Sequence, residues 1–359
     1  MSRFLLAGGG TGGHVNPLLA LGELLRNRKH EVIALGTKEG LESRLVPNRG
    51  FELITIPRLP LPRRLSLGTF SYPFRLILAS LHVARVIRTR KVDCVVGFGG
   101  YASAPAYLAA WFTGTTLVVH EANALAGFAN KLGAKLTKWV AVTFPNSNLQ
   151  DARVTGMPIR EEIVASVSAY NQQQARIELG LDPMLPTLLV TGGSLGAKSI
   201  NESIAASLDK LNAAGIQVLH IVGDRANLED ISQAGYSRMA YCKAMDVAIS
   251  ASDFAVSRAG ASTVSEFAAT GLPALYIPYP VGNGEQRLNA ASIVEAGGGL
   301  LIDDSEFNSD YVSSTLIPLI SHKKGLISMS KAARSQAIID ATERLAEFVL
   351  EAMDTNTRD

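Results

Sequence analysis

The amino-acid sequence predicts an α/β protein of two Rossmann-like domains, each built on a parallel sheet. One pattern, an apolar strand running into a glycine-rich turn, occurs at residues 5–13 and again at 188–196. Each copy precedes a helical pattern, at about 17–27 and 198–211. The chain has 359 residues, more than one hydrophobic core usually holds. Because a strand, a glycine-rich turn and a helix start form an anion site, two copies indicate an enzyme that joins two phosphate-bearing substrates.

Short apolar runs alternate with helical stretches along the whole chain. Such runs are typical of strands covered on both faces, and their alternation with helices predicts parallel sheets. In the first half the expected strands are Phe4–Ala7, Val32–Leu35, Leu53–Ile56, Cys94–Gly97, Leu117–His120 and Trp139–Val142. In the second half they are Leu188–Thr191, Gln217–Val222, Phe254–Ser257 and Ala274–Ile277.

The domain boundary is expected near residue 160. Residues 144–158 are rich in Pro, Asn, Ser and Gly and are predicted to be the linker. Residues 330–352 have apolar side chains at helical spacing, and we expect a helix that crosses back onto the first domain; the alternative is that it simply ends the second. The predicted domains are therefore 1–160 with 340–359, and 161–339.

Composition narrows the class of protein. The chain is 47% apolar and 18% charged, as in globular proteins. Its two cysteines, Cys94 and Cys242, fall in different halves, so we expect no disulfide and a reducing cytoplasm. No run of 18 apolar residues and no metal-ligand spacing is present, so neither a membrane span nor a metal or other cofactor is expected.

Residues Gly8, Gly10 and Gly13 satisfy the dinucleotide-binding fingerprint. That fingerprint also needs an acid at the end of the second strand, which here ends in Gly-Thr-Lys, while Glu31 stands at the other end. An NAD-dependent dehydrogenase is therefore disfavoured. The crowding of glycine instead suits a diphosphate lying close against the turn.

Polar residues follow the strands of the first half at their carboxyl ends, where open α/β sheets bind ligands. His14 is predicted at a helix start, where the dipole favours neutral imidazole; it is either a general base for an acceptor hydroxyl or a histidine bonded to nearby backbone. Asn123 is either a substrate ligand or a turn residue. Glu121 is either a base or a structural hydrogen-bond partner.

The second half has two polar segments after strands, at residues 257–266 and 282–290. Arg258 is suited to neutralise phosphate, and Glu266 is suited to hold a ribose diol unless it is a surface carboxylate. Gln286 and Asn289 resemble sugar-hydroxyl ligands, the alternative being a helix-capping loop.

Residues 53–92 contain no acid and eight bases. Apolar side chains are interleaved with the bases, which favours an anionic membrane surface. The alternatives are a packed helix with solvated arginines and, least favoured, nucleic acid. The bases are Arg58, Arg63, Arg64, Arg75, Arg85, Arg88, Arg90 and Lys91; the apolar residues are Leu59, Leu61, Leu65, Leu67, Phe70, Tyr72, Phe74, Leu76, Ile77 and Leu81.

Taken together, the motifs resemble those of the MurG-type family of peptidoglycan glycosyltransferases, which have the GT-B fold: two Rossmann-like domains facing a cleft. Seven ordered motifs carry the resemblance: Gly9-Gly10-Thr11-Gly12-Gly13-His14-Val15-x-Pro17, Gly99-Gly100-Tyr101, His120-Glu121-x-Asn123, Gly156-x-Pro158-x-Arg160, Gly192-Gly193-Ser194-x-Gly196-Ala197, Arg258-x-Gly260-Ala261-x-Thr263-x-Ser265-Glu266 and Gln286-x-x-Asn289-Ala290. The resemblance implies inverting transfer of N-acetylglucosamine from UDP-N-acetylglucosamine to the muramoyl 4-hydroxyl of lipid I, which gives lipid II.

The resemblance also implies roles for individual residues. The second domain would bind the donor, with residues 241–245 framing the uracil, and the first would bind lipid I and sit on the anionic inner leaflet at the cytoplasmic face of the membrane. The implied donor residues are Arg160, Ser194, Arg258, Ala261, Ser262, Thr263, Glu266, Gln286 and Asn289. The implied acceptor residues are Gly10, Thr11, Gly12, Gly13, Tyr101 and Asn123, with His14 as the catalytic candidate.

Four positions depart from the commonest family pattern: Ala122 replaces Gln, Met157 replaces Asn, Ser262 replaces Leu, and Glu285 replaces Asp, His or Gln. Three other functions compete with the transferase. They are a relative of the same fold, such as a UDP-N-acetylglucosamine 2-epimerase or a glycolipid synthase, the disfavoured dehydrogenase, and a silent scaffold. Other cell-wall synthesis proteins are expected as partners, whereas nucleic acid is not.

Overall fold

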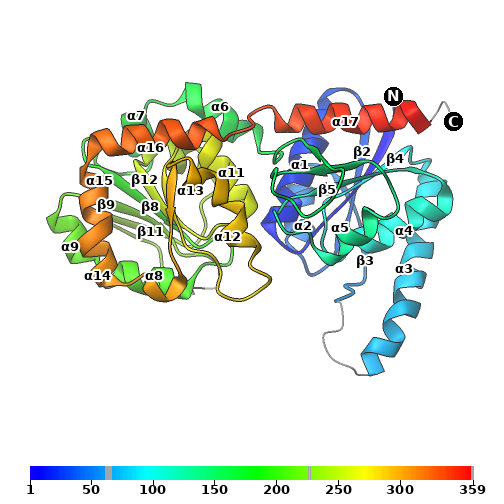
Figure 1. Ribbon diagram of the computed structural model, residues 1–359, viewed down its shortest axis with the longest axis horizontal. Coiled ribbons are helices and arrows are strands. Elements are labelled where there is room, and N and C mark those ends of the chain that lie inside the picture. Colours follow the sequence, from blue (N-terminus) through cyan, green and yellow to red (C-terminus); the bar gives the residue numbers. More distant parts are fainter. Residues whose placement is uncertain (61–66, 225, 227, 357–359) are drawn as a thin grey trace. The chain divides into compact units, whose positions relative to one another are not determined.

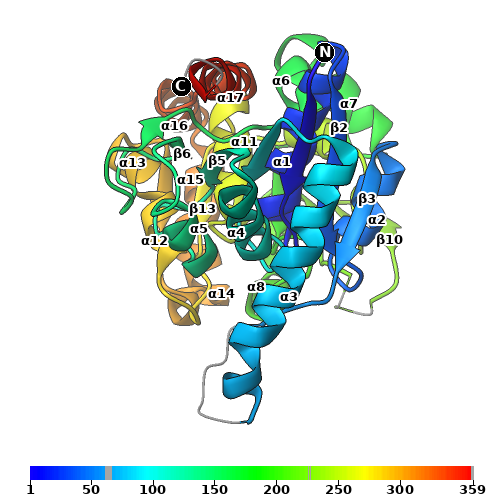
Figure 2. The same ribbon diagram turned by 90° about the vertical axis from the view of Figure 1, so that its right-hand side faces the viewer.

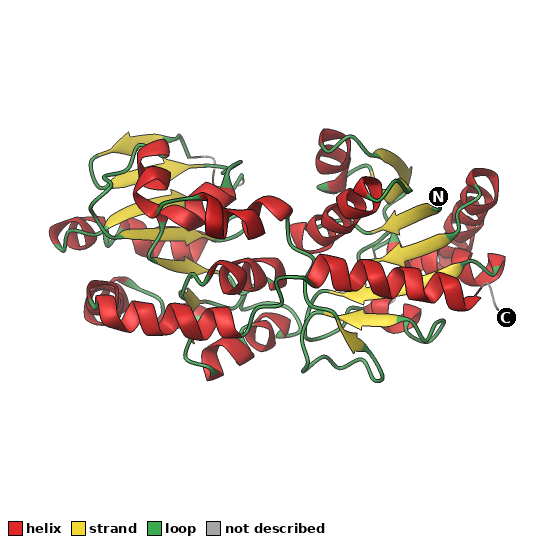
Figure 3. Cartoon of the chain, turned by 90° about the horizontal axis from the view of Figure 1, so that it is seen from above, coloured by secondary structure: helices red, strands yellow, loops and turns green. Residues whose placement is uncertain are grey.

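The computed structural model describes residues 1–60, 67–224, 226 and 228–356, with the backbone alone for 67–70 and 356. The chain forms two compact units (Figure 1): Met1–Arg160 with Ile339–Asp359, and Glu161–Ile338. Each unit holds one seven-stranded sheet, so the predicted α/β architecture of two Rossmann-like domains is confirmed. Within each unit the strands lie between helices (Figure 3).

The first sheet is parallel throughout and has the order β3-β2-β1-β4-β5-β6-β7. Alternate side chains of its central strand enter two separate cores: Phe4 and Leu6 join one, and Leu5 and Ala7 the other. Both faces are therefore buried, as the continuous apolar runs predict. The strands are β1 (Arg3–Ala7), β2 (Glu31–Thr37), β3 (Glu52–Ile56), β4 (Cys94–Gly97), β5 (Thr116–Glu121), β6 (Val140–Val142) and β7 (Arg153–Val154).

In the described part of this unit the helices are α1 (Gly12–Asn27), α2 (Glu42–Asn48), α3 (Leu67–Arg90), α4 (Ser103–Thr113), α5 (Phe128–Gly133) and α17 (Ala341–Asn356). The last helix, α17, packs on α1, and its Phe348 ring meets the edge of Trp139. Figure 2 shows the amino-terminal half of α3 projecting from the sheet of its own unit. Little of the unit therefore packs around this half of the helix.

The second sheet has the order β10-β11-β9-β8-β12-β13-β14, parallel except for the β10–β11 pair. Its strands are β8 (Thr187–Thr191), β9 (Gln217–Ile221), β10 (Ile231–Gln233), β11 (Tyr236–Met239), β12 (Phe254–Ser257), β13 (Ala274–Tyr276) and β14 (Gly299–Leu301). Its helices are α6 (Glu161–Ala169), α7 (Gln172–Glu178), α8 (Lys198–Ala205), α9 (Leu208–Ala213), α10 (Met245–Ala251), α11 (Ala261–Thr270), α12 (Glu285–Asn289), α13 (Ala291–Glu295), α14 (Ser309–Tyr311), α15 (Ile317–Ser321) and α16 (Lys323–Ser335), with short turns η1 (Asp304–Glu306) and η2 (Val312–Leu316).

Three details differ from the sequence predictions. Residues 144–158, predicted as a linker, hold strand β7, which pairs with β6 and extends the first sheet. The helix predicted over 198–211 is two helices, α8 and α9. The helix predicted over 330–352 is also two, because α16 ends at Ser335 and α17 begins at Ala341. Apolar spacing alone did not show these breaks, since it continues across both. Among the described residues no helix is both long and apolar enough to span a membrane.

Candidate active site

In both sheets the strand order reverses beside the strand that runs into the glycine-rich turn. In the first sheet this switch point lies between β1 and β4, and in the second between β8 and β12. Ligands of open α/β sheets bind at such points, beyond the carboxyl ends of the strands. The loops at these ends are residues 8–11 and 98–102 in the first unit, and 192–197 and 258–260 in the second. They contain most of the motifs that the sequence singles out.

In the first unit the two glycine-rich loops touch through their backbones. A Cβ atom on Gly100 would lie 2.3 Å from the carbonyl oxygen of Gly9, so only glycine fits there. Gly10 and Gly100 both have positive φ, at 89° and 83°. The ring of Tyr101 flanks Gly10, and its hydroxyl accepts a hydrogen bond from Arg58, 3.2 Å away. The structure thus brings Gly10 and Tyr101 of the predicted acceptor set together.

His14 lies in the first turn of α1, beside both loops. Its Nδ1 is 3.0 Å from the carbonyl oxygen of Gly9 and 3.2 Å from Thr11 Oγ1. Because a carbonyl can only accept, Nδ1 carries the proton and donates it, which leaves the lone pair of neutral imidazole on Nε2. Thr11 is the N-cap of α1, and Gly12 and Gly13 are its first residues, whose N–H groups have no acceptor within a helix.

Glu42 is a residue of this site that the sequence analysis missed. Its carboxylate is fully buried. It accepts hydrogen bonds from the N–H of Gly10 at 2.8 Å and from the N–H and hydroxyl of Thr37 at 2.8 and 2.7 Å. Thr37 stands where a dinucleotide-binding fold places its ribose-binding acid. Here the nearby carboxylate, that of Glu42, accepts hydrogen bonds from protein donors instead.

Glu121 is buried at the end of β5 and organises the loop that follows. Its carboxylate accepts from the N–H groups of Asn123 at 2.9 Å and Gly127 at 3.0 Å, and from the side chain of Asn130 at 2.9 Å. These bonds favour the interpretation of Glu121 as a structural hydrogen-bond partner over that of a catalytic base. Asn123 is half-buried. Asn130, which the sequence analysis also missed, accepts a hydrogen bond from the hydroxyl of Tyr107 and so links Tyr107 to Glu121.

His120 precedes this network and is completely buried. Its Nε2 lies 3.0 Å from the carbonyl oxygen of Gly156, and its Nδ1 has no hydrogen-bond partner. Burial lowers the pKa of His120 to about 4, so the imidazole is neutral. Nε2 therefore donates to Gly156 and ties the end of β5 to the backbone that follows β7. Arg160 ends the first unit four residues further on.

In the second unit the glycine-rich loop after β8 packs against the loop after β9. A Cβ atom on Gly196 would lie 2.1 Å from the carbonyl oxygen of Val222, and one on Gly223 would lie 2.1 Å from the N–H nitrogen of Gly196. Ser194 is half-buried, and its carbonyl oxygen accepts from the N–H of Asp224 at 3.2 Å. The first unit has the same arrangement, in which two glycine-containing loops are in backbone contact.

Arg258 follows β12 and is held by protein groups. It forms an ion pair with Asp304, donates to Ser199 Oγ at 3.0 Å, and reaches the carbonyl oxygens of Ile277 at 3.3 Å and Pro278 at 3.2 Å. Asp304 also accepts from the Ser199 hydroxyl at 2.7 Å. Arg258 therefore joins the start of α8 to the ends of β13 and β14. Neither Ser199 nor Asp304 stands in the motifs.

Helix α11 starts at the switch point of the second sheet and carries four of the predicted donor residues. Ala261 and Ser262 form its first turn, and the Ser262 hydroxyl is buried without a hydrogen-bond partner. Thr263 is half-buried, and Glu266 is buried one turn further along. No side chain caps the helix at Gly260. The helix start therefore presents its N–H groups and one unused hydroxyl to a ligand.

The two amides predicted as sugar ligands have protein partners. Asn289 is fully buried, and its side chain donates to the carbonyl oxygen of Ala259 at 3.1 Å. Gln286 accepts from the N–H of Tyr279 at 2.9 Å. Asn289 thus supports the loop before α11. Among the described residues no group of three His, Cys, Asp or Glu side chains could hold a metal ion.

Comparisons with known proteins agree on one family. Residues 4–142 match the glycosyltransferase family 28 N-terminal domain, and residues 187–345 match its C-terminal domain. The UDP-N-acetylglucosamine–N-acetylmuramyl-(pentapeptide) pyrophosphoryl-undecaprenol N-acetylglucosamine transferase of Leifsonia xyli subsp. xyli is 49% identical, over 97% of this chain and 98% of the relative. The Streptomyces coelicolor protein of the same name is 46% identical, over 99% of both chains.

A solved structure extends the likeness to the fold. The crystal structure of Acinetobacter baumannii MurG superposes with a TM-score of 0.77 at 26% identity, over 98% of this chain and 100% of the other. The chain therefore belongs to glycosyltransferase family 28 and, within it, to the family of UDP-N-acetylglucosamine–N-acetylmuramyl-(pentapeptide) pyrophosphoryl-undecaprenol N-acetylglucosamine transferases.

Proposed function

We propose that this protein transfers N-acetylglucosamine from UDP-N-acetylglucosamine to the muramoyl 4-hydroxyl of lipid I, with inversion at the anomeric carbon, to give lipid II. Relatives named for this transfer match almost the whole chain. The observation in the structure that carries the proposal is the contact between the loops of Gly9 and Gly100 beside His14. This contact supports a binding place for a diphosphate beside a proton acceptor in the same unit.

The first unit is the acceptor domain in this proposal. The lipid I diphosphate lies at the start of α1, where the N–H groups of Thr11, Gly12 and Gly13 and the helix dipole favour an anion. Tyr101 flanks that loop, and its partner Arg58 adds positive charge nearby. Asn123 binds a polar group of the muramoyl sugar or its substituents.

His14 is the proposed general base. Its Nε2 takes the proton of the 4-hydroxyl as that oxygen forms a bond to the anomeric carbon of N-acetylglucosamine. The bond from that carbon to the UDP oxygen breaks, and UDP leaves with the electron pair. Because the attacking oxygen and UDP lie on opposite faces of the sugar, the configuration inverts. The tautomer fixed by Gly9 leaves Nε2 free for this step.

The second unit is the donor domain. The start of α11 and the loop of Ser194 are placed to stabilise the negative charge that grows on UDP. The unpartnered hydroxyl of Ser262 supports a donor ligand there, since buried polar groups are rarely left without a partner. Glu266 holds the ribose diol. Arg258, which is held in its ion pair with Asp304, adds positive charge that helps to stabilise the departing UDP.

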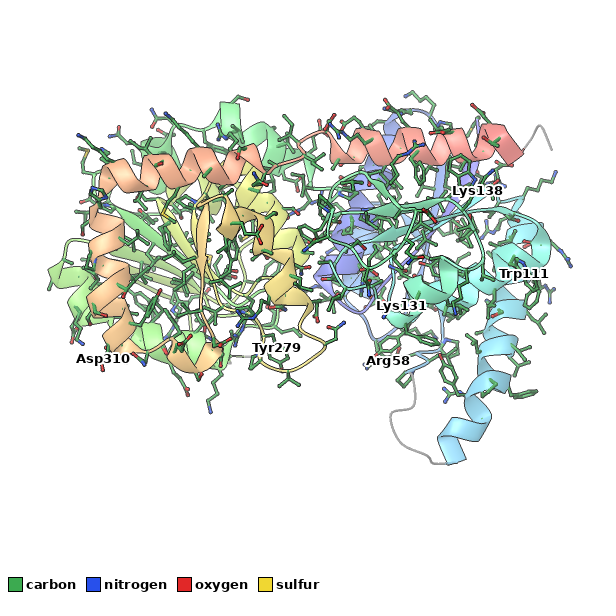
Figure 4. The ribbon with its side chains drawn as sticks, viewed as in Figure 1. Arg58, Trp111, Lys131, Lys138, Tyr279 and Asp310 are labelled. Atoms are coloured by element: carbon green, nitrogen blue, oxygen red, sulfur yellow. The ribbon has the colours of Figure 1, made fainter. Side chains whose placement is uncertain are left out.

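An anionic membrane surface is the proposed seat of the first unit. Phe74, Ile77, Leu78 and Leu81 are exposed and spaced along one face of α3. Trp111, Phe112 and Phe128 on α4 and α5 are also exposed, and α4 contacts both α3 and α5. Figure 4 shows Trp111 and Lys131 on the surface of this unit. Exposed Arg75, Arg85, Lys131 and Lys135 lie on the same helices or next to them, as anionic lipid requires.

This surface refines the sequence prediction. Leu59 is buried, and Tyr72 and Leu76 are half-buried, so they belong to the packed part of the segment. Leu61, Arg63, Arg64 and Leu65, and the side chains of Leu67 and Phe70, lie outside the described residues. The proposed location is the cytoplasmic face of the membrane, where lipid I and other cell-wall synthesis proteins are within reach.

The proposal is tested by following UDP release from UDP-N-acetylglucosamine with and without a short-chain lipid I analogue. We expect release that depends on the acceptor, and a product with the β configuration at the new bond. Release that is equally fast without the acceptor would indicate hydrolysis or epimerisation and would overturn the proposed transfer.

A further inference from the structure

We propose that Glu42 is a positioning residue that orients His14 through the peptide group joining Gly9 and Gly10. The inference rests on the proposed function, because it gives a purpose to the orientation of His14. It concerns a carboxylate that lies outside every motif and does not reach the reacting atoms.

One peptide group connects the two side chains. Its N–H, that of Gly10, donates to Glu42 Oε2 at 2.8 Å. Its carbonyl, that of Gly9, accepts from His14 Nδ1 at 3.0 Å. The chain of contacts therefore runs from the carboxylate to the peptide N–H, and from the peptide carbonyl to the imidazole. A carboxylate that polarises the N–H strengthens the carbonyl as an acceptor, because linked hydrogen bonds reinforce one another.

The carboxylate has no freedom to leave this position. Its other oxygen, Oε1, accepts from the N–H and hydroxyl of Thr37. A Cβ atom on Gly9, Gly36 or Gly40 would lie 2.3, 2.4 or 2.1 Å from an atom of the Glu42 side chain. The Glu42 side chain thus fills the space that side chains at these three positions would need. Its close packing fixes the plane of the Gly9–Gly10 peptide.

The donors around Glu42 explain why an acceptor is buried here. An apolar side chain would leave the N–H groups of Gly10 and Thr37 and the Thr37 hydroxyl without this acceptor. A carboxylate accepts only, so it holds the Gly10 N–H in one direction and turns the Gly9 carbonyl toward His14. His14 then keeps its proton on Nδ1 and its lone pair on Nε2, which is the tautomer that a base requires.

The test compares Glu42→Gln with Thr37→Val. Glutamine keeps the size of the side chain, but whichever way its amide turns, an NH₂ group faces Gly10 or Thr37. Thr37→Val removes one hydrogen bond to Oε1 and leaves both the carboxylate and the Gly10 contact. We expect Glu42→Gln to lower kcat by about 10- to 100-fold, with the KM for UDP-N-acetylglucosamine changed less than about 2-fold. Thr37→Val should lower Tm but keep kcat within about 3-fold.

The decisive readout needs no substrate. In ¹⁵N-histidine-labelled protein, with the His14 signals assigned by their loss in His14→Gln, the wild type should show the Nδ1–H tautomer. Glu42→Gln should shift His14 towards the Nε2–H tautomer, and Thr37→Val should not. If Glu42→Gln does not fold, Gly40→Ala serves instead, because its new Cβ atom would lie 2.1 Å from Oε2 and 2.3 Å from Oε1 and so would move the carboxylate away from Gly10 without changing residue 42.

An unchanged tautomer in the Glu42 variant would overturn the inference, as would equal losses of kcat in the Glu42 and Thr37 variants. Failure of the proposed function looks different. The wild type would then not transfer sugar to a lipid I analogue, while the tautomer measurement would still decide the role of Glu42.

Discussion

Gly99 lies directly against the imidazole of His14: a Cβ atom on Gly99 would stand 3.1 Å from Nε2 and 3.4 Å from the side-chain nitrogen of Asn130. Gly99 also has a positive φ of 90°, which disfavours other residues. The nitrogen that carries the lone pair of His14 therefore faces backbone with no side chain. A side chain at this position would therefore stand against Nε2.

Replacing His14 by alanine removes the proposed base. We expect kcat to fall by about 10²-fold or more, because general-base catalysis contributes about that much. Binding of UDP, measured by calorimetry, should be unchanged, since the proposed donor site is in the other unit. A loss of only a few-fold in kcat would make His14 a structural residue.

Replacing Glu266 by alanine should weaken the donor. A carboxylate that holds both ribose hydroxyls contributes about 1.5–3 kcal/mol, so we expect the Kd for UDP to rise by about 10- to 100-fold. The KM for the lipid I analogue should stay the same. The matched control is Glu202→Ala, at an exposed glutamate of the same unit that forms an ion pair with Lys198. Equal UDP affinity in the Glu266 variant and the wild type would exclude the ribose role.

The membrane seat is tested by replacing Phe74, Ile77 and Leu81 together by serine. Each side chain is about half or more exposed, so the change should cost little stability. We expect much weaker binding to vesicles containing anionic phospholipid, and unchanged activity on a water-soluble acceptor. Ile327→Ser, at an exposed isoleucine of the second unit, is the control. Vesicle binding that persists in the triple variant would contradict the proposed seat.

The buried histidines predict how stability depends on pH. Burial lowers the pKa of His220 from 6.5 to about 4. The unfolded chain thus binds a proton at higher pH than the folded protein does. The stability from keeping this imidazole neutral is complete above about pH 6.5 and is lost as the pH falls towards 4.

Each histidine of this kind removes about 2 kcal/mol between pH 7 and 5. Urea unfolding of wild type and His220→Gln at several pH values checks this. The variant loses the contacts of His220 with Tyr236 and Asn201, so it should be less stable at pH 7 but show a shallower fall towards pH 5. His322→Gln, at an exposed histidine, should keep the wild-type slope. An unaltered slope in the His220 variant would contradict the assignment.

The fold was predictable because its signals are local. A buried parallel strand is a continuous apolar run, and glycine-rich turns such as 8–13 and 192–196 mark the switch points directly. The short strands β7, β10, β11 and β14 were not found, since a few residues that pair at or next to a sheet edge carry no distinctive pattern. The breaks after α8 and α16 were missed because the apolar spacing continues across both.

The grouping of Gly10, His14 and Tyr101 was predictable, because each lies in or next to a glycine-rich turn at the same edge of the sheet. Glu42 and Asp304 were missed because folding alone brings them to Gly10 and Arg258. The sequence does hold a signal for Glu42: Gly36 and Gly40 precede it closely, and both are small because its side chain fills their space.

The most direct test of the central claim is a transfer assay with labelled UDP-N-acetylglucosamine and two short-chain lipid I analogues, one with the muramoyl 4-hydroxyl and one in which hydrogen replaces it. The account predicts label in the lipid with the first analogue and none with the 4-deoxy analogue, because that hydroxyl is the attacking group. Equal labelling of both analogues, or no labelling of either, would contradict it.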